Sequence, residues 1–275
     1  MERITVGDGY LAVRRYEADG GERGRCLLIP PFRVPADVLD PVARALVDRG
    51  FETAVVDPRN HVGEGSGGIT HFRLSTFAED CQAAIEAIRP TCLVAVSLGA
   101  RAALRALGRG APCPAAVLVT PVVEVDATLC VVLGRDWFGV PAGQVPPLLS
   151  VLGMDIDAPR FRQDCLDHDL VTADSTVPDA IGYDGRLHLI PGTEDPWVEC
   201  DAVHRLADRL ARPDRVVVRP VTCDRHAFHE DADLALRIVG ALIEEVESAH
   251  TAMDSRTIGD VTADPERPTN EPMAS

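Results

Sequence analysis

A serine flanked by small residues is the first place in this sequence where covalent chemistry is possible. Residues 95–99 read AVSLG, and they join an apolar run to the start of a predicted helix. The order matches G-x-S-x-G with Ala95 at the first glycine, and the tight turn of that motif requires small residues two positions from the serine. A hydroxyl held there points away from the sheet, beside helix amides that favour developing negative charge. We predict that Ser97 is a nucleophile; the alternative is that it only caps the helix.

A serine nucleophile needs a base that takes its proton and an acid that orients the base. Asp195 and His226 each lie in a loop directly after a short apolar run, in the chain order serine, acid, histidine. That placement suits an acid and a base at the ends of two consecutive strands. We predict that Asp195 is the acid and His226 the base. Two neighbours, Glu194 and His229, remain as alternatives for these roles.

Backbone amides are the expected partners of the negative oxygen that forms when a serine attacks a carbonyl group. Leu98 directly follows the serine. Phe32 is the first residue after Pro30 and Pro31, and those prolines have no N–H to donate. We predict that the amides of Phe32 and Leu98 form an oxyanion hole. The alternative for Phe32 is a turn residue whose ring only fills the core.

Short apolar runs alternate with segments of helical periodicity along most of the chain. Runs of this kind predict buried strands, whereas apolar residues spaced by three or four predict amphipathic helices. The alternation is typical of a mainly parallel sheet covered on both faces, so we predict a doubly wound α/β fold. Predicted strands span 3–6, 10–16, 26–29, 51–56, 91–96, 115–119, 186–190 and 215–219, and predicted helices span 36–49, 76–88, 98–107, 199–210 and 232–247.

The alternation is interrupted between about residues 122 and 182. Scattered apolar residues and loop-forming Gly, Pro and Asp fill this stretch, and we predict that it is a cap inserted between two strands. From residue 250 onward Thr, Asp, Pro and Glu replace apolar residues. We therefore predict one domain over residues 1–249, including the cap, and a disordered tail over 250–275.

Composition excludes several classes of partner. The formal net charge is −16 with a pI near 4.8, which argues against nucleic acid and anionic membrane surfaces. Apolar runs are shorter than the ~20 residues of a membrane span. Eight cysteines occur without a C-x-x-C spacing, and the first residues show no apolar secretion signal. We predict a cytoplasmic protein that needs no metal and no cofactor.

With these residues in place, the chain resembles the α/β-hydrolase superfamily. It is more closely similar to the acyl-transferase subunit family of the bacterial bioluminescence fatty acid reductase, whose members are acyl carrier protein thioesterases. The similarity spans about residues 10–245 and departs at Pro31, where the family pattern has glycine. It is carried by Phe32, 61–63, 66–67, 95–98, 100–101, 161–162, 164–165, 174–176, Asp195, 197–198 and His226.

The resemblance implies an α/β-hydrolase fold and release of a fatty acyl group from a carrier-protein thioester through an acyl-serine. We expect a serine acyl-thioester hydrolase or acyl transferase that acts on acyl carrier protein or CoA thioesters in fatty acid or polyketide biosynthesis. One alternative is a carboxylesterase or lactonase with the same triad. Another is a non-catalytic subunit that binds acyl chains or acts as a scaffold.

Two further expectations concern the cap and the serine's helix. Arg101, Arg105 and Arg109 share one helix face, which is typical of a solvated or structural face and less often of a docking site for a carrier protein. The cap has many apolar residues for an insertion, so we expect it to line an acyl pocket. The residues predicted to do so are Trp137, Phe138, Leu148, Leu149, Leu152 and Met154.

Overall fold

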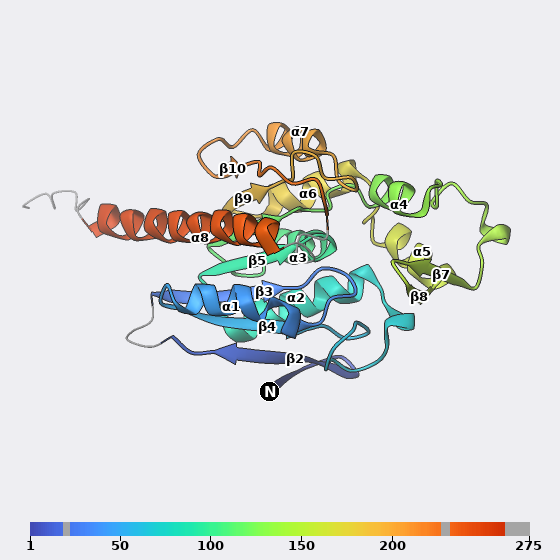
Figure 1. Cartoon of the computed structure of the whole chain (residues 1–275), viewed down its shortest axis with the longest axis horizontal. Coiled ribbons are helices and arrows are strands. Elements are labelled where there is room, and N and C mark those ends of the chain that lie inside the picture. Colours follow the sequence, from blue (N-terminus) through green and yellow to red (C-terminus); the bar gives the residue numbers. More distant parts are fainter. Residues whose placement is uncertain (19–22, 227–231, 262–275) are drawn as a thin grey trace, which may run out of the picture.

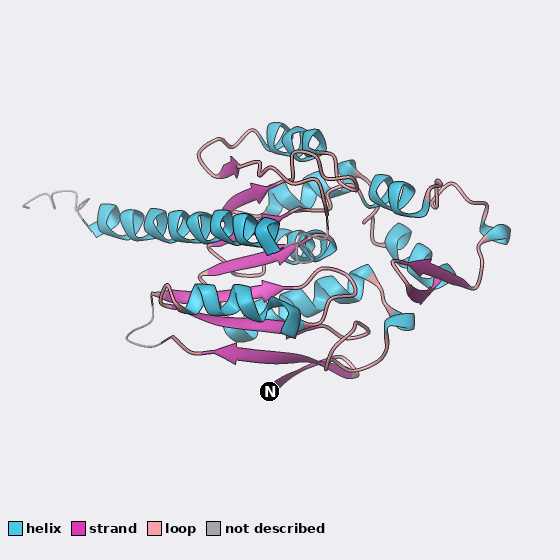
Figure 2. Ribbon diagram, viewed as in Figure 1, coloured by secondary structure: helices cyan, strands magenta, loops and turns pink. Residues whose placement is uncertain are grey.

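Eight strands form the central sheet of the computed structural model, which describes residues 1–18, 23–226 and 232–261. The strand order is β1-β2-β4-β3-β5-β6-β9-β10. All neighbours from β4 to β10 are parallel, whereas β1 and β2 form an antiparallel hairpin at the edge (Figures 1 and 2). The strands are β1 (Glu2–Val6), β2 (Gly9–Tyr16), β3 (Gly24–Ile29), β4 (Phe51–Asp57), β5 (Cys92–Val96), β6 (Ala115–Val119), β9 (Arg186–Ile190) and β10 (Val216–Val218).

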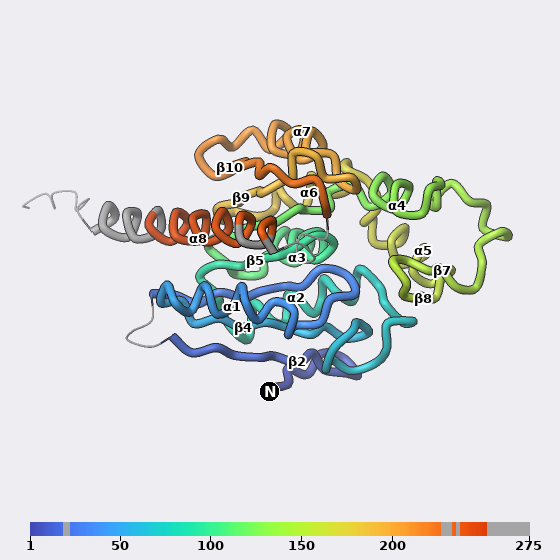
Figure 3. The backbone as a smooth tube through the Cα atoms, in the orientation of Figure 1, coloured from blue at the N-terminus to red at the C-terminus, as the bar shows by residue number. Residues whose placement is uncertain are grey.

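Helices cover both faces of this sheet because successive strand residues point to opposite sides. On β5, Leu93 and Ala95 belong to one hydrophobic core, while Cys92, Val94 and Val96 belong to the other. Helices α1 and α8 lie side by side over the second core (Figure 3). The helices of the body are α1 (Asp40–Val47), α2 (Leu74–Ile88), α3 (Leu98–Gly108), α6 (Ala173–Gly182), α7 (Cys200–Leu210) and α8 (Ala232–Val261).

The insertion between β6 and β9 forms a cap beyond the carboxyl ends of the parallel strands (Figure 1). The last residues of the predicted cap form helix α6, which packs against α3 on the body. The segments that project from the body are α4 (Val125–Leu133), a 3₁₀ turn (Ala142–Gln144), a hairpin of β7 (Leu148–Val151) and β8 (Met154–Asp157), and α5 (Ala158–Asp167).

Most predicted elements agree with the structure to within one or two residues, and two do not. The predicted helix over 36–49 is divided into a 3₁₀ turn (Ala36–Leu39) and α1, at Pro41 in the first turn of α1. The prediction that a tail begins at residue 250 needs correction, because helix α8 continues to Val261. The His250 ring lies 5.6 Å from that of Phe51, so residue 250 packs against the body of the protein. Residues 262–275 lie outside the described residues.

Candidate active site

Ser97 occupies a strained turn between the end of β5 and the start of α3. Its backbone angles are φ 55° and ψ −123°, a region that a residue with a Cβ rarely adopts. The turn is held by hydrogen bonds from the Ser97 N–H to the Val119 carbonyl, 2.9 Å, and from the Ala100 N–H to the Ser97 carbonyl, 3.0 Å. Strain that is over-determined in this way is a feature of functional turns. The predicted strand–turn–helix context of Ser97 is therefore present.

A hydrogen-bonded chain connects Ser97 to the two residues predicted to act with it. The Ser97 hydroxyl lies 2.6 Å from Nε2 of His226, and Nδ1 of His226 lies 2.8 Å from Oδ2 of Asp195. When Nδ1–H donates to the carboxylate, Nε2 carries the lone pair that can accept the serine proton. All three side chains are buried. The structure thus brings together three residues that are 98 and 31 positions apart in the chain.

The loop after β9 orients the acid. Oδ1 of Asp195 accepts hydrogen bonds from the backbone N–H groups of Trp197, at 2.9 Å, and Val198, at 3.2 Å. This leaves Oδ2 directed at His226, whose ring is stacked on Trp197 with centroids 4.7 Å apart. Glu194, the alternative acid, is exposed and is not the carboxylate that contacts His226. His229, the alternative base, lies outside the described residues.

The loop after β3 lies against the serine turn. Phe32 and Leu98, the two residues predicted to supply oxyanion donors, line the same cavity as Ser97. Leu98 is the first residue of α3, so the helix does not use its N–H. A Cβ built on Gly99 would fall within 3.0 Å of the Pro30 carbonyl oxygen. Glycine at this position therefore allows the turn and the loop to be in direct contact.

A buried histidine fixes the far side of that loop. Nε2 of His61 accepts a hydrogen bond from the Arg33 N–H, 3.1 Å, and its ring lies 6.1 Å from that of Phe32. Burial lowers the pKa of His61 to about 4, so it is neutral near pH 7 and can accept this bond. The contact of His61 with the Phe32 loop is not predicted from the sequence.

A largely apolar cavity opens onto Ser97 and His226. Helix α4 supplies four of its lining residues, spaced at i, i+3, i+4 and i+7 along one face. All lining residues except Ser97, Thr128 and His226 are hydrophobic. They are Phe32, Phe72, Ser97, Leu98, Val122, Val125, Thr128, Leu129, Val132, Val151, Leu152, Ile156, Phe161, Trp197 and His226.

The cap residues predicted to line this pocket need correction. Among the six named from the sequence, Leu152 lines the cavity, whereas Trp137, Phe138, Leu148, Leu149 and Met154 do not. Trp137 and Leu149 are buried in the hydrophobic core, with 0% and 3% exposure, and Leu148 is 49% exposed. The signal that identifies the wall is the helical spacing of Val125, Leu129 and Val132, in a stretch for which no helix was predicted.

The three arginines of α3, Arg101, Arg105 and Arg109, do not form an exposed docking face. Arg101 is fully buried and Arg105 is largely buried, and both pair with Asp179 of α6. Arg109 alone of the three is exposed. Within the described ranges, no group of three His, Cys, Asp or Glu side chains is arranged to hold a metal ion. In the same ranges, no helix is long and apolar enough to cross a membrane.

Several solved structures have the same fold as this protein. A ferulic acid complex of Est1E from Butyrivibrio proteoclasticus has a TM-score of 0.73 at 15% identity, covering 92% of this chain and 100% of that one. The monoacylglycerol lipase of Paleococcus ferrophilus has a TM-score of 0.67 at 19% identity, covering 87% and 99%. The thioesterase domain of the curacin biosynthetic pathway has a TM-score of 0.60 at 15% identity, covering 88% of this chain and 98% of that one. These likenesses confirm the predicted α/β-hydrolase fold.

Proteins related in sequence identify the family within this fold. An acyl transferase of Photorhabdus luminescens is 27% identical over 221 residues, which are 78% of this chain and 69% of the relative. An acyl transferase of Vibrio harveyi is 27% identical over 227 residues, which are 79% and 71% of the two chains. The family model described as acyl transferase matches residues 23–272. The resemblance predicted from the sequence is confirmed, and the chain belongs to this acyl transferase family.

Proposed function

We propose that this protein is a serine acyl transferase or thioesterase that removes an acyl group from a thioester through an acyl-serine at Ser97. The observation that carries the proposal is the chain of hydrogen bonds from Ser97 through His226 to Asp195, which opens onto an apolar cavity. A nucleophile, a base and an orienting acid in this geometry are the requirements of acyl transfer through a covalent intermediate.

The proposed reaction has two halves. Nε2 of His226 takes the hydroxyl proton as Oγ of Ser97 attacks the thioester carbonyl, and the amides of Leu98 and Phe32 donate to the oxyanion. The carbon–sulfur bond breaks, and His226 returns its proton to the leaving thiolate. Water or an acceptor alcohol or thiol then loses a proton to His226 and attacks the acyl carbonyl. The bond from that carbon to Oγ of Ser97 breaks, and His226 returns the proton to Oγ. Asp195 stays ionised throughout and stabilises the imidazolium that forms in each half.

The cavity supports a fatty acyl chain as the group transferred. Its walls offer hydrophobic side chains, and Thr128 is the polar lining residue besides Ser97 and His226. Burial of each methylene group against such walls contributes about 0.8 kcal/mol. We propose acyl carrier protein or CoA thioesters as substrates, within fatty acid or polyketide biosynthesis. Membership of the acyl transferase family and the structural similarity to the curacin thioesterase domain support a thioester substrate. The structural similarity to an esterase and a lipase makes oxygen esters the second candidate class of substrate.

We place this reaction in the cytoplasm. All eight cysteines are free thiols, and six of them are buried. Cys26 and Cys92 are register partners on the neighbouring strands β3 and β5, yet they form no disulfide. Burial raises the pKa of both thiols, so they remain protonated and unreactive. Free cysteines in adjacent strands are typical of a reducing compartment.

Intact mass spectrometry after mixing with acyl thioesters tests the proposal. We expect the protein to gain the mass of the acyl group from acyl carrier protein or acyl-CoA, and Ser97→Ala to gain none. Ser150→Ala, which removes an exposed serine of β7, is the matched control and should be acylated like the wild type. Acylation or undiminished turnover by Ser97→Ala would refute the mechanism.

Parallel kinetics separate the alternatives. Faster acylation by p-nitrophenyl esters or lactones than by thioesters of the same chain would favour the carboxylesterase or lactonase. Binding of acyl thioesters with neither a covalent adduct nor turnover would favour a non-catalytic acyl-binding subunit. The proposed activity predicts thioester acylation that depends on Ser97, His226 and Asp195 together, because members of such a triad act as a unit.

A further inference from the structure

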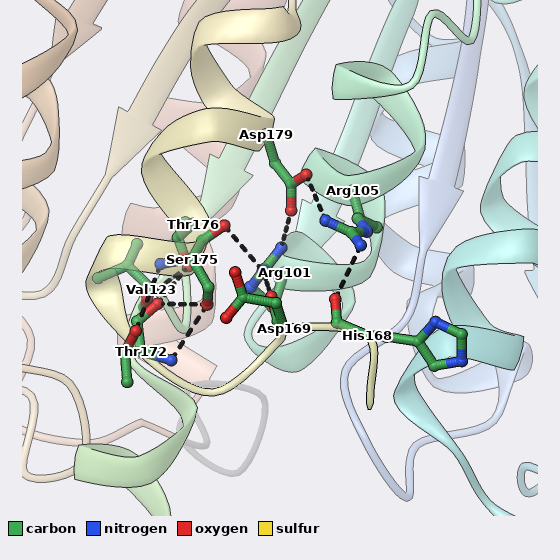
Figure 4. Close-up of polar contacts among 9 residues, drawn as sticks. All are labelled: Arg101, Arg105, Val123, His168, Asp169, Thr172, Ser175, Thr176 and Asp179. Atoms are coloured by element: carbon green, nitrogen blue, oxygen red, sulfur yellow. Dashed lines mark hydrogen bonds and ion pairs between the residues drawn. The ribbon is translucent and has the colours of Figure 1, made fainter. Parts of the chain in front are cut away.

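A buried ion-pair cluster joins the helix of Ser97 to the last helix of the insertion. Nη1 of Arg101 lies 2.7 Å from Oδ2 of Asp179, and Nη1 of Arg105 lies 2.8 Å from Oδ1 (Figure 4). The two arginines are one turn apart on α3, so a single carboxylate of α6 can accept from both. Asp179 is 7% exposed at its side chain, and Arg101 is fully buried. Interactions between such charges are much less screened than at a surface.

The same arginines also hold the chain that leads into α6. Nη2 of Arg105 donates to the His168 carbonyl at 2.7 Å, and Nη2 of Arg101 lies 3.4 Å from the carbonyls of Asp169 and Ser175. The helices touch at their glycines, because a Cβ on Gly182 would fall within 3.0 Å of the Gly108 carbonyl oxygen. Helix α6 and the segment before it are therefore fixed to α3.

Helix α6 also holds the start of α4. The Thr176 hydroxyl donates to the Val123 carbonyl at 2.8 Å (Figure 4). The Asp126 N–H donates to the Val171 carbonyl at 3.1 Å. The Thr176 hydroxyl also lies 3.2 Å from the Thr172 carbonyl of its own helix, so the shorter bond is the one that leaves α6. Thr176 has no exposed surface. Residues 123–126, from which α4 begins, are thus attached to α6.

Helix α4 forms one wall of the cavity, against which a long acyl chain would lie. The Val122 N–H donates to the Ser97 carbonyl at 3.2 Å, so the segment starts beside the nucleophile. The lining residues from Val125 to Val132 then extend about 10 Å along the helix axis. Figure 1 shows α4 leading away from the body. A two-carbon group needs only the start of this wall, whereas a long chain needs all of it.

We propose that Thr176 is a specificity-determining positioning residue, whose hydrogen bond to Val123 fixes the α4 wall relative to Ser97 and so sets the length of acyl chain that the cavity accepts. The inference rests on the proposed function. Thr176 acts through Val123 and α4 and does not line the cavity. Arg101, Arg105 and Asp179 form the anchor on which its position depends.

Substitution of Thr176 tests this coupling more cleanly than substitution of Asp179. Without Asp179 the buried charge of Arg101 has no partner carboxylate, and loss of one member of a buried ion pair is strongly destabilising. Thr176→Val keeps the shape of the side chain and replaces the hydroxyl by a methyl group. Thr176→Ser is the matched control, because it keeps the hydroxyl and loses a methyl group.

The probes are fluorophosphonates with ethyl, octyl and dodecyl chains, and the readout is the rate of adduct formation by intact mass. In Thr176→Val we expect the dodecyl-to-ethyl rate ratio to fall about fivefold, the effect of one hydrogen bond. Thr176→Ser should keep the wild-type ratio. An equal loss of rate with all three probes, or an unchanged ratio in Thr176→Val, would show that Thr176 has only a structural role and would overturn the inference.

Hydrogen exchange tests the coupling without any reaction at Ser97. We expect peptides covering 125–133 to exchange faster in Thr176→Val than in Thr176→Ser, while peptides covering 98–108 stay protected in both. Unchanged exchange over 125–133 would refute the coupling even if every probe reacts. If no probe labels the wild-type protein while exchange over 125–133 still rises, the proposed function fails and the mechanical coupling stands.

Discussion

Replacing Gly99 by alanine should impair catalysis more than substrate binding. A Cβ at residue 99 would meet the Pro30 carbonyl oxygen at less than 3.0 Å and Cγ2 of Ile29 at 3.1 Å. The first of these atoms is backbone, so it cannot rotate away as a side chain does. Either the serine turn or the loop that carries Phe32 must shift, and both form the proposed oxyanion hole.

The size of the effect follows from those contacts. Adding one methyl group to a close-packed site costs about 1–3 kcal/mol of stability. Displacing one oxyanion donor lowers kcat about 10²-fold, as complete removal of a donor does in serine hydrolases. We expect Gly99→Ala to lose stability in urea unfolding within that range and to lose kcat towards an acyl thioester, with KM changed by less than about threefold, because the far walls of the cavity stay in place.

Gly143→Ala is the matched control. Gly143 lies in the 3₁₀ turn of the cap, and a Cβ there would have no neighbour within 4 Å. We expect its kcat and its stability to equal those of the wild type. Gly99→Ala with wild-type kcat and wild-type stability would show that the serine turn and the Pro30 loop are not in the contact described, and the oxyanion assignment would lose its basis.

Two more predictions follow from His61 and from the cavity wall. Burial lowers the pKa of His61 to about 4 against 6.5 unfolded, so its contribution to stability is complete above pH 6.5 and is lost as the pH falls through 4. Between pH 7 and pH 4 the wild type should therefore lose about 3 kcal/mol more unfolding free energy than His61→Gln; equal losses in urea titrations would contradict this. Leu129→Trp fills the cavity, so thioesterase activity towards long acyl chains should fall about tenfold or more relative to acetyl thioesters. Leu148→Trp, at an exposed position outside the cavity, is its control, and equal chain-length profiles in the two variants would exclude α4 as the wall.

The positions of the proposed triad could be predicted because each residue follows a strand. Parallel strands in one sheet bring their carboxyl ends to the same edge, so chain order and strand ends together indicate which loops meet. That reasoning predicted that Asp195 and His226 lie beside Ser97, although the sequence contains no information on the distances between them. It could not choose between Asp195 and Glu194 on geometry, because adjacent residues of one loop differ only in the direction of their side chains.

The cavity wall could not be predicted from composition alone. The sequence of α4, VDATLCVVL, is apolar nearly throughout, so its mean hydropathy conceals the face formed by Val125, Leu129 and Val132. Trp137 and Leu149 were named because the cap has many apolar residues, but both are buried in the hydrophobic core and do not line the cavity. Large apolar side chains in an insertion indicate that it has a core, and they do not show which of its faces meets the active site.

The arginines of α3 show what periodicity can reveal and what it leaves open. Their spacing places Arg101, Arg105 and Arg109 on one face, but it says nothing of α6, which follows some 70 residues later and covers the first two. The sequence of α3, LGARAALRALG, nevertheless contains the missing signal. Apart from its arginines the helix is apolar on every side, and a helix apolar all round is buried. A charge on such a helix must find a buried partner, because an unpaired charge in the interior is too costly. The helix composition therefore favours an internal ion pair over a docking surface, and the buried carboxylate of Asp179 supplies it.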